Sequence, residues 1–143
     1  MAAKWVPFYN IDKAVGPYAP NQPDDVMLVQ FFLSRIAAAA TTSIARPETP
    51  IQVNGVYTPE LSQWILWYQK SNNTSGVTQL VADGRVDPMQ GVRGAEQGAM
   101  PLTINALNRS YRRRFRASHD TLDQDQSVPA QLRQRFAASE FPA

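Results

Sequence analysis

Apolar residues recur at intervals of three and four along three stretches of the chain, the spacing of one face of an α-helix. The first stretch is expected to run from an N-cap at Asp24 or Asp25 to about Ala40, the second from Thr58 to near Lys70, and the third from near Thr103. The three stripes are Val26, Val29, Leu33 and Ile36; Leu61, Trp64, Ile65 and Tyr68; and Ile104, Leu107, Tyr111 and Phe115. The pattern predicts a mainly α fold.

The first two predicted helices are apolar around their whole circumference. Met27, Leu28, Phe31 and Phe32 add to the first stripe, and Leu66 and Trp67 lie outside the second. A helix that is apolar on every side is buried on every side, so these helices need more cover than they give one another. We expect the two ends of the chain, or another subunit, to supply it. Trp67 is expected in the core or an interface, with stacking on a sugar as the alternative.

The two ends of the chain carry apolar residues of their own. Residues 1–23 form an arm that cannot be helical, because Pro7, Pro17, Pro20 and Pro23 interrupt it. Its aromatic residues predict that the arm lies on its own core or on a neighbour, and the candidate interface residues are Trp5, Phe8 and Tyr9. After Ser127 and Pro129 we expect a short final helix with Val128, Leu132 and Phe136 on its apolar face.

Short motifs complete the pattern. They are Asp25-Val26-x-x-Val29-Gln30-x-x-Leu33, Asn54-Gly55-Val56-Tyr57-Thr58-Pro59, Tyr68-Gln69, Asp83-Gly84-Arg85-Val86 and Thr103-x-x-Ala106-Leu107. In this order, over residues 16–115, the chain resembles the peptidoglycan-binding-like three-helix domain. The resemblance implies a three-helix core at 24–116, an extended N-terminal arm at 1–23, and a C-terminal extension at 117–143 with a short helix. Trp64 stands where that family tends to carry alanine, so the resemblance predicts the fold and leaves the ligand open.

Charge is distributed unevenly along the chain. The net charge of +2 is too small to indicate a nucleic-acid-binding protein, but from Arg109 onward seven arginines face four acidic residues. The candidate ligand or partner contacts are Arg112, Arg113 and Arg116, together with Tyr57 and Trp67. The alternative is that the arginines form a solvated face that pairs with Asp120, Asp123 and Asp125. A phosphate or nucleic-acid contact through Arg109–Arg116 is a third hypothesis.

Catalytic chemistry finds little support in these residues. The chain has no cysteine, a single histidine and no Gly-x-Ser-x-Gly motif, so we expect no enzyme, no metal site and no cofactor. His119-Asp120 is expected to be a solvated turn. The apolar run that a signal peptide needs is missing from the start of the chain, and no segment has the roughly 18 apolar residues of a membrane helix. We expect synthesis in the cytoplasm without a signal peptide and no membrane partner.

Two functions fit these expectations. The first is a non-catalytic structural protein of a bacteriophage virion or injection apparatus, whose partners are other protein subunits of the assembly. The alternative is a cell-wall binding module that takes peptidoglycan as its ligand and targets a partner hydrolase to it. Nucleic acid is not an expected partner under either hypothesis.

Overall fold

The computed structural model describes residues 7–75, 78–90 and 102–138. The helices are α1 (Pro23–Ala39), α2 (Pro59–Thr74), α3 (Thr103–Arg114), α4 (Arg116–Asp120) and α5 (Ala130–Ala138), with a 3-10 turn η2 (Leu122–Gln124) between the last two. The described residues contain no strand, only an isolated antiparallel bridge between Val15 and Val86. The mainly α prediction is confirmed.

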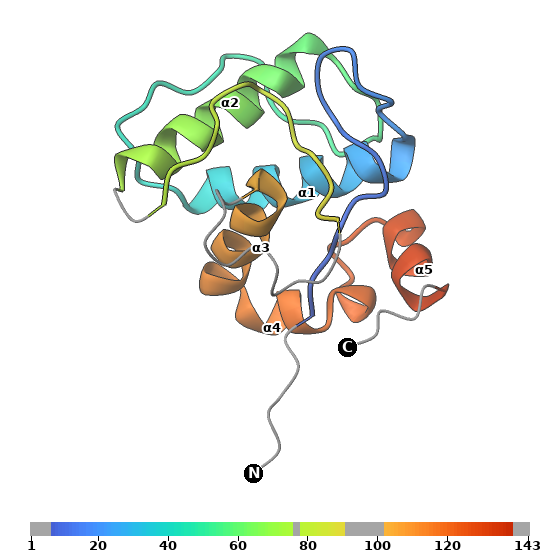
Figure 1. The fold of residues 1–143 in the computed structure, drawn as a ribbon. Helices are drawn as coiled ribbons and strands as arrows, with labels where there is room; N and C mark the ends of the chain where they lie inside the picture. The colour runs from blue at the N-terminus through green and yellow to red at the C-terminus, as the bar shows by residue number, and fades with distance from the viewer. Residues whose placement is uncertain (1–6, 76–77, 91–101, 139–143) are drawn as a thin grey trace.

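Helix α1 lies at the centre of the molecule, with α2 on one side and α3, α4 and α5 on the other (Figure 1). It contacts α2, α3 and α5, and its residues from Asp25 to Leu33 are all buried. The prediction that an all-round apolar helix is buried on every side is therefore confirmed. The cover comes from this chain itself, including the described part of the N-terminal arm and helix α5.

The N-terminal arm packs on the core of its own chain. Tyr9 is 4% exposed, and Ile11 and Val15 are fully buried in the same cluster as α1. Tyr9 exchanges two backbone hydrogen bonds with the Asn108 side chain, and its hydroxyl donates to the carbonyl oxygen of His119 at 2.6 Å. Tyr9 is therefore a core residue of this chain, which corrects its assignment to an intersubunit interface. Phe8 is half-buried against the same core, and Trp5 lies outside the described residues.

Asp25 joins the arm to helix α1, and this corrects the expectation that Asp24 or Asp25 caps that helix. The N-cap is Gln22, which makes no side-chain cap. The buried Asp25 carboxylate instead accepts hydrogen bonds from the backbone N–H groups of Asp12 and Lys13, at 2.9 and 3.0 Å. Burial raises the pKa of Asp25, an effect that these hydrogen bonds and Arg135 of α5 oppose.

Helix α2 has the predicted start, with Thr58 as its N-cap, and runs a full turn beyond Lys70 to Thr74. Trp64 and Tyr68 are buried, as predicted. The Trp64 indole N–H donates to the carbonyl of Thr49 at 2.7 Å. The Trp67 indole N–H donates to the carbonyl of Ile44 at 3.2 Å. The two indoles thus hold the long connection between α1 and α2 against the helix.

Two buried glutamines hold the two glycine turns in the same way. The Gln30 side-chain oxygen accepts from the N–H groups of Asn54 and Gly55, at 3.0 and 2.8 Å. The Gln69 oxygen accepts from those of Asp83 and Gly84, at 3.1 and 2.9 Å. Each glutamine amide also donates to the carbonyl of the residue after the glycine. We call these two arrangements the glutamine clasps.

The C-terminal extension belongs to the same core. Val128, Leu132 and Phe136 are buried as predicted, although α5 begins at Ala130, after Val128. His119 is also buried, which corrects the expectation of a solvated turn. Its Nε2 lies 3.1 Å from Asn108 Oδ1 and its Nδ1 lies 3.1 Å from Asp120 Oδ1. Burial lowers the pKa of His119, and the Asp120 carboxylate opposes that shift.

Candidate functional site

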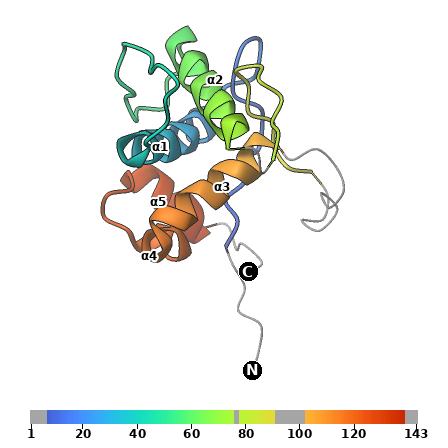
Figure 2. The same cartoon turned by 90° about the vertical axis from the view of Figure 1, so that its left-hand side faces the viewer.

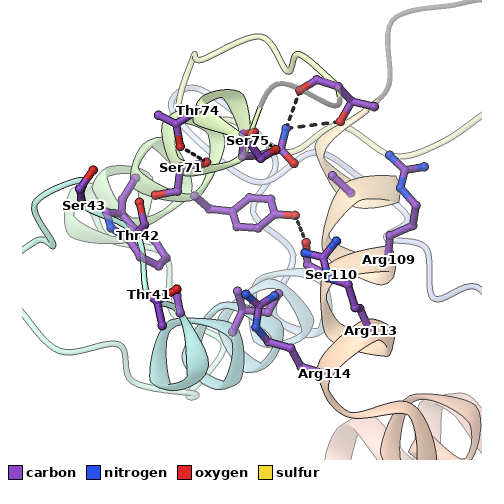
Figure 3. Close-up of a pocket in the computed structure, with 17 residues that line it drawn as sticks. Thr41, Thr42, Ser43, Ser71, Thr74, Ser75, Arg109, Ser110, Arg113 and Arg114 are labelled. Carbon is purple, nitrogen blue, oxygen red and sulfur yellow. Dashed lines mark hydrogen bonds between the residues drawn. The ribbon is translucent and has the colours of Figure 1, made fainter.

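A groove of about 460 Å³ opens where the ends of α1 and α2 meet the side of α3. Figure 3 shows its walls: hydroxyl side chains from the α1 and α2 side face arginines on α3. The hydroxyls come from Thr41, Thr42 and Ser43 after α1 and from Ser71, Thr74 and Ser75 at the end of α2. We call this the hydroxyl–arginine groove. Its volume is within the usual range for small-ligand sites.

The floor of the groove is rigid and partly aromatic. The Tyr68 hydroxyl and Ser110 Oγ share a hydrogen bond of 2.6 Å that joins α2 to α3. Burial raises the pKa of Tyr68 to about 12, and the hydrogen bond with Ser110 and the charges of Arg109, Arg113 and Arg114 oppose the rise. Tyr68 is therefore a neutral phenol at neutral pH.

The arginine wall contains one of the predicted contacts and omits two others. Arg109, Arg113 and Arg114 line the groove. Arg112 lies outside it and forms a two-point ion pair with Asp120, at 2.9 and 3.2 Å. This hydrogen bond lowers the pKa of the Asp120 carboxyl.

Arg116 also lies outside the groove, with its Nε 4.0 Å from Asp120 Oδ2 and its side chain 74% exposed. The expected ion pair with Asp120 is confirmed for Arg112, whose side chain is half-buried. Asp125 instead accepts hydrogen bonds from Ser118 and Ser127. The basic stretch therefore divides into a groove-facing set and a set that pairs with Asp120.

Neither aromatic candidate offers the groove an exposed ring. Trp67 lines the groove but is only 3% exposed, because Trp64 packs edge-on against its ring and the Arg46 guanidinium lies over it, 5.3 Å from the ring centre. This corrects the alternative in which Trp67 is a sugar-stacking platform. Tyr57 lies outside the groove in the turn before α2, where its hydroxyl shares a 2.6 Å hydrogen bond with Ser62.

Some of the residues that line the groove can be recognised in the sequence, although the apolar periodicity of the helices does not identify them. Thr41-Thr42-Ser43 and the Ser71–Ser75 segment follow the apolar stripes of the first two helices, and together they provide the hydroxyl walls. Successive helical residues point about 100° apart, so residues 112 and 114 diverge on either side of Arg113. That spacing alone places Arg114 and Arg112 on different faces of α3.

The part of the chain that the structure describes contains no candidate metal site, since no group of three histidine, cysteine, aspartate or glutamate side chains comes together there. The helices within the same residues are all too short or too polar to cross a bilayer. What the groove offers is hydrogen bonding by hydroxyls and positive charge from guanidinium groups. Such a set can hold a ligand without a catalytic step.

Comparison with protein-family models, with curated proteins and with solved structures finds no match. The resemblance to the peptidoglycan-binding-like domain therefore remains an interpretation of the motifs.

Proposed function

We propose that this chain is a non-catalytic cell-wall binding module that holds peptidoglycan in the hydroxyl–arginine groove. The observation that carries the proposal is the groove itself, whose walls offer many hydroxyls to a sugar-bearing ligand while no described lining residue is acidic. Peptidoglycan is the candidate ligand because it is the ligand of the family that the motifs resemble, and the experiment below tests whether this chain binds it. In this proposal the module would serve to place a partner hydrolase on the wall.

The packing of the arm also favours a self-contained binding module. The assembly hypothesis draws its support from an aromatic arm that needs a surface to cover it. The chain supplies that surface itself, through the cluster that holds Tyr9, Ile11 and Val15. The burial of these three residues therefore does not require a neighbouring subunit.

Co-sedimentation with purified cell-wall sacculi tests the proposal. We expect the monomeric protein to pellet with sacculi and to stay in solution with cellulose, which offers sugar hydroxyls but no peptide. Light scattering before the assay establishes that the protein is monomeric. Protein that remains in the supernatant with sacculi would contradict the proposal.

The structural role in a virion or injection apparatus is a second candidate, and one observation favours it. Tyr18 is fully exposed and holds a left-handed backbone conformation, φ 57°, which costs free energy for a residue with a side chain. Asn21 fixes this turn by hydrogen bonds to both backbone groups of Gly16 and to the carbonyl of Ala19. A rigid turn that presents a tyrosine suits insertion into a partner protein.

Tyr18→Ala tests this second candidate. If the turn anchors a partner subunit, the native complex isolated with the variant should lack one protein that mass spectrometry finds with the wild type. An identical set of co-purified proteins would contradict the assembly role of this turn.

A further inference from the structure

The arginines of the groove differ from the other arginines that the structure describes. Arg109, Arg113 and Arg114 have no ion pair or hydrogen-bond partner among the described residues. The other described arginines each contact a carboxylate, a hydroxyl, a carbonyl or an aromatic ring: Arg35, Arg46, Arg85, Arg112, Arg116, Arg133 and Arg135. The guanidinium groups without such partners are the ones that share the groove.

Helix capping does not explain these three arginines. The C-terminal ends of α1 and α2 border the groove, and free carbonyl groups there could attract cations. Arg46 already donates to the Ala37 and Ala40 carbonyls at the end of α1, at 2.7 and 3.0 Å. At the end of α2, the hydroxyls of Thr74 and Ser75 donate to the carbonyls three residues earlier, both at 2.7 Å. The α3 arginines make no hydrogen bond to either end among the described residues.

The three guanidinium groups all influence the pKa of the same side chain, Tyr68. All of them favour the ionised form of the buried Tyr68 phenol at the groove floor. None of the described lining residues carries a negative charge that would neutralise them. Across the groove, Ser71 Oγ is shielded from solvent and has no hydrogen-bond partner among the described residues. The groove thus combines a positive wall with a wall of hydroxyls, one of them unsatisfied.

We infer that the α3 wall is a carboxylate subsite, and that the groove selects peptidoglycan fragments with free stem-peptide carboxylates over neutral glycans of similar size. This inference rests on the proposed function and adds the chemical group that decides affinity. Guanidinium groups bind carboxylates through paired, charge-assisted hydrogen bonds. The hydroxyl wall then faces the polar remainder of the fragment, through Thr41, Thr42 and Ser75.

Nuclear magnetic resonance titration of the full chain with three probes tests the inference. The probes are a disaccharide–tetrapeptide muropeptide, the same muropeptide with its carboxyl groups converted to amides, and uncharged tetra-N-acetylchitotetraose. We expect the muropeptide with free carboxylates to bind at least about tenfold more tightly than either probe without carboxylates, and to shift the side-chain N–H resonances of the groove arginines. Raising the salt concentration should weaken this binding.

Two variants locate the effect. Arg109→Gln with Arg113→Gln should weaken binding of the acidic muropeptide by about tenfold or more and leave the melting temperature nearly unchanged, because both side chains are exposed. Arg116→Gln removes one positive charge from an exposed position outside the groove and should bind like the wild type.

The outcomes separate this inference from the proposed function. Equal binding of the acidic and amidated muropeptides, or an unaffected double variant, would overturn the carboxylate subsite and leave wall binding in place. A protein that binds neither sacculi nor any of the three probes would overturn both. Tighter binding of a single-stranded oligonucleotide, with shifts of the same arginine resonances, would also overturn the subsite, since phosphate would then be the preferred anion.

Discussion

At the scale of single residues, the glutamine clasps show how two distant motifs act alike. Gln30 and Gln69 are buried, and each satisfies two backbone N–H groups and a carbonyl of a glycine turn. Both turns need glycine, since Gly55 and Gly84 have φ of 77° and 71°. A Cβ at position 84 would lie 3.2 Å from the Ser62 carbonyl oxygen. Each turn therefore requires both its glycine and the glutamine that binds it.

Gln69→Ala should lower the free energy of unfolding by about 2 to 3 kcal/mol, because the buried N–H group of Gly84 and its neighbours lose their partner. Urea unfolding measures the change. Gln63→Ala is the matched control: its side chain is exposed on the same helix, so its effect should stay within about 0.5 kcal/mol. Equal stabilities for the two variants would show that the clasp is dispensable.

The raised pKa of Tyr68 predicts how the free energy of unfolding changes at alkaline pH. Its pKa is raised from 10.0 to about 12 in the folded protein, so between these values the folded state retains a proton that the unfolded chain releases. The free energy of unfolding should therefore fall as pH rises through this window, by up to about 1.4 kcal/mol per pH unit for this group. Tyr68→Phe should reduce that slope. The tyrosinate absorbance difference between wild type and variant should show a transition near pH 12.

Much of this residue-level detail could not be predicted from the sequence. The sequence identifies Gln30, Gln69 and both glycines as parts of motifs, but their pairing requires the path of the chain between them. His119 illustrates the same limit. One histidine among polar residues is typical of a solvated turn, and only the approach of Asn108 and Tyr9 from distant segments makes it a buried residue.

At the scale of elements, helical periodicity predicts the three main helices and most of their buried stripes, because it depends on local spacing alone. The exception is Phe115, which follows the last residue of α3 as its C-cap and is half-buried. The ends are less predictable. Helix α1 begins at the N-cap Gln22 without a side-chain cap, and Asp25 in its first turn binds the arm instead. Helix α2 extends past its expected end near Lys70 to Thr74. The arm carries no periodicity, so its sequence does not decide which surface covers its aromatics.

Two tyrosines of the arm test its packing. Tyr9→Ala should lower the free energy of unfolding by about 3 to 5 kcal/mol, the range for truncating a large buried aromatic side chain, and also removes its hydrogen bond to the His119 carbonyl. Tyr18→Ala removes an exposed tyrosine from the same arm and should change stability by no more than about 0.5 kcal/mol. Thermal or urea unfolding of a verified monomer gives both values. A small effect of Tyr9→Ala would mean that the arm detaches in solution.

At the scale of the whole molecule, the described chain closes around α1 from both directions. The arm crosses from α5 to the turn before Val86, and α5 returns to pack beside α1 (Figure 2). Leu122, Leu132 and Phe136 share a single apolar cluster with Tyr9 and the three main helices. The two walls of the groove belong to elements that are held together by the Tyr68–Ser110 hydrogen bond and by packing on α1.

Because the arm and the C-terminal extension complete the core, we can predict how a fragment of residues 24–116 behaves without them. A fragment of those residues would lose Tyr9, Leu122 and Leu132 from the apolar cluster. It would also remove the Tyr9 backbone groups that bond the Asn108 side chain, and the backbone N–H groups of Asp12 and Lys13 that bond Asp25. Since the whole free energy of unfolding of such a domain is about 5 to 15 kcal/mol, we expect the fragment to lack a cooperative unfolding transition. The full chain should show one transition by both circular dichroism and tryptophan fluorescence. If the fragment instead unfolds cooperatively with a midpoint close to that of the full chain, the arm and extension are additions to a self-sufficient three-helix domain and not part of its core.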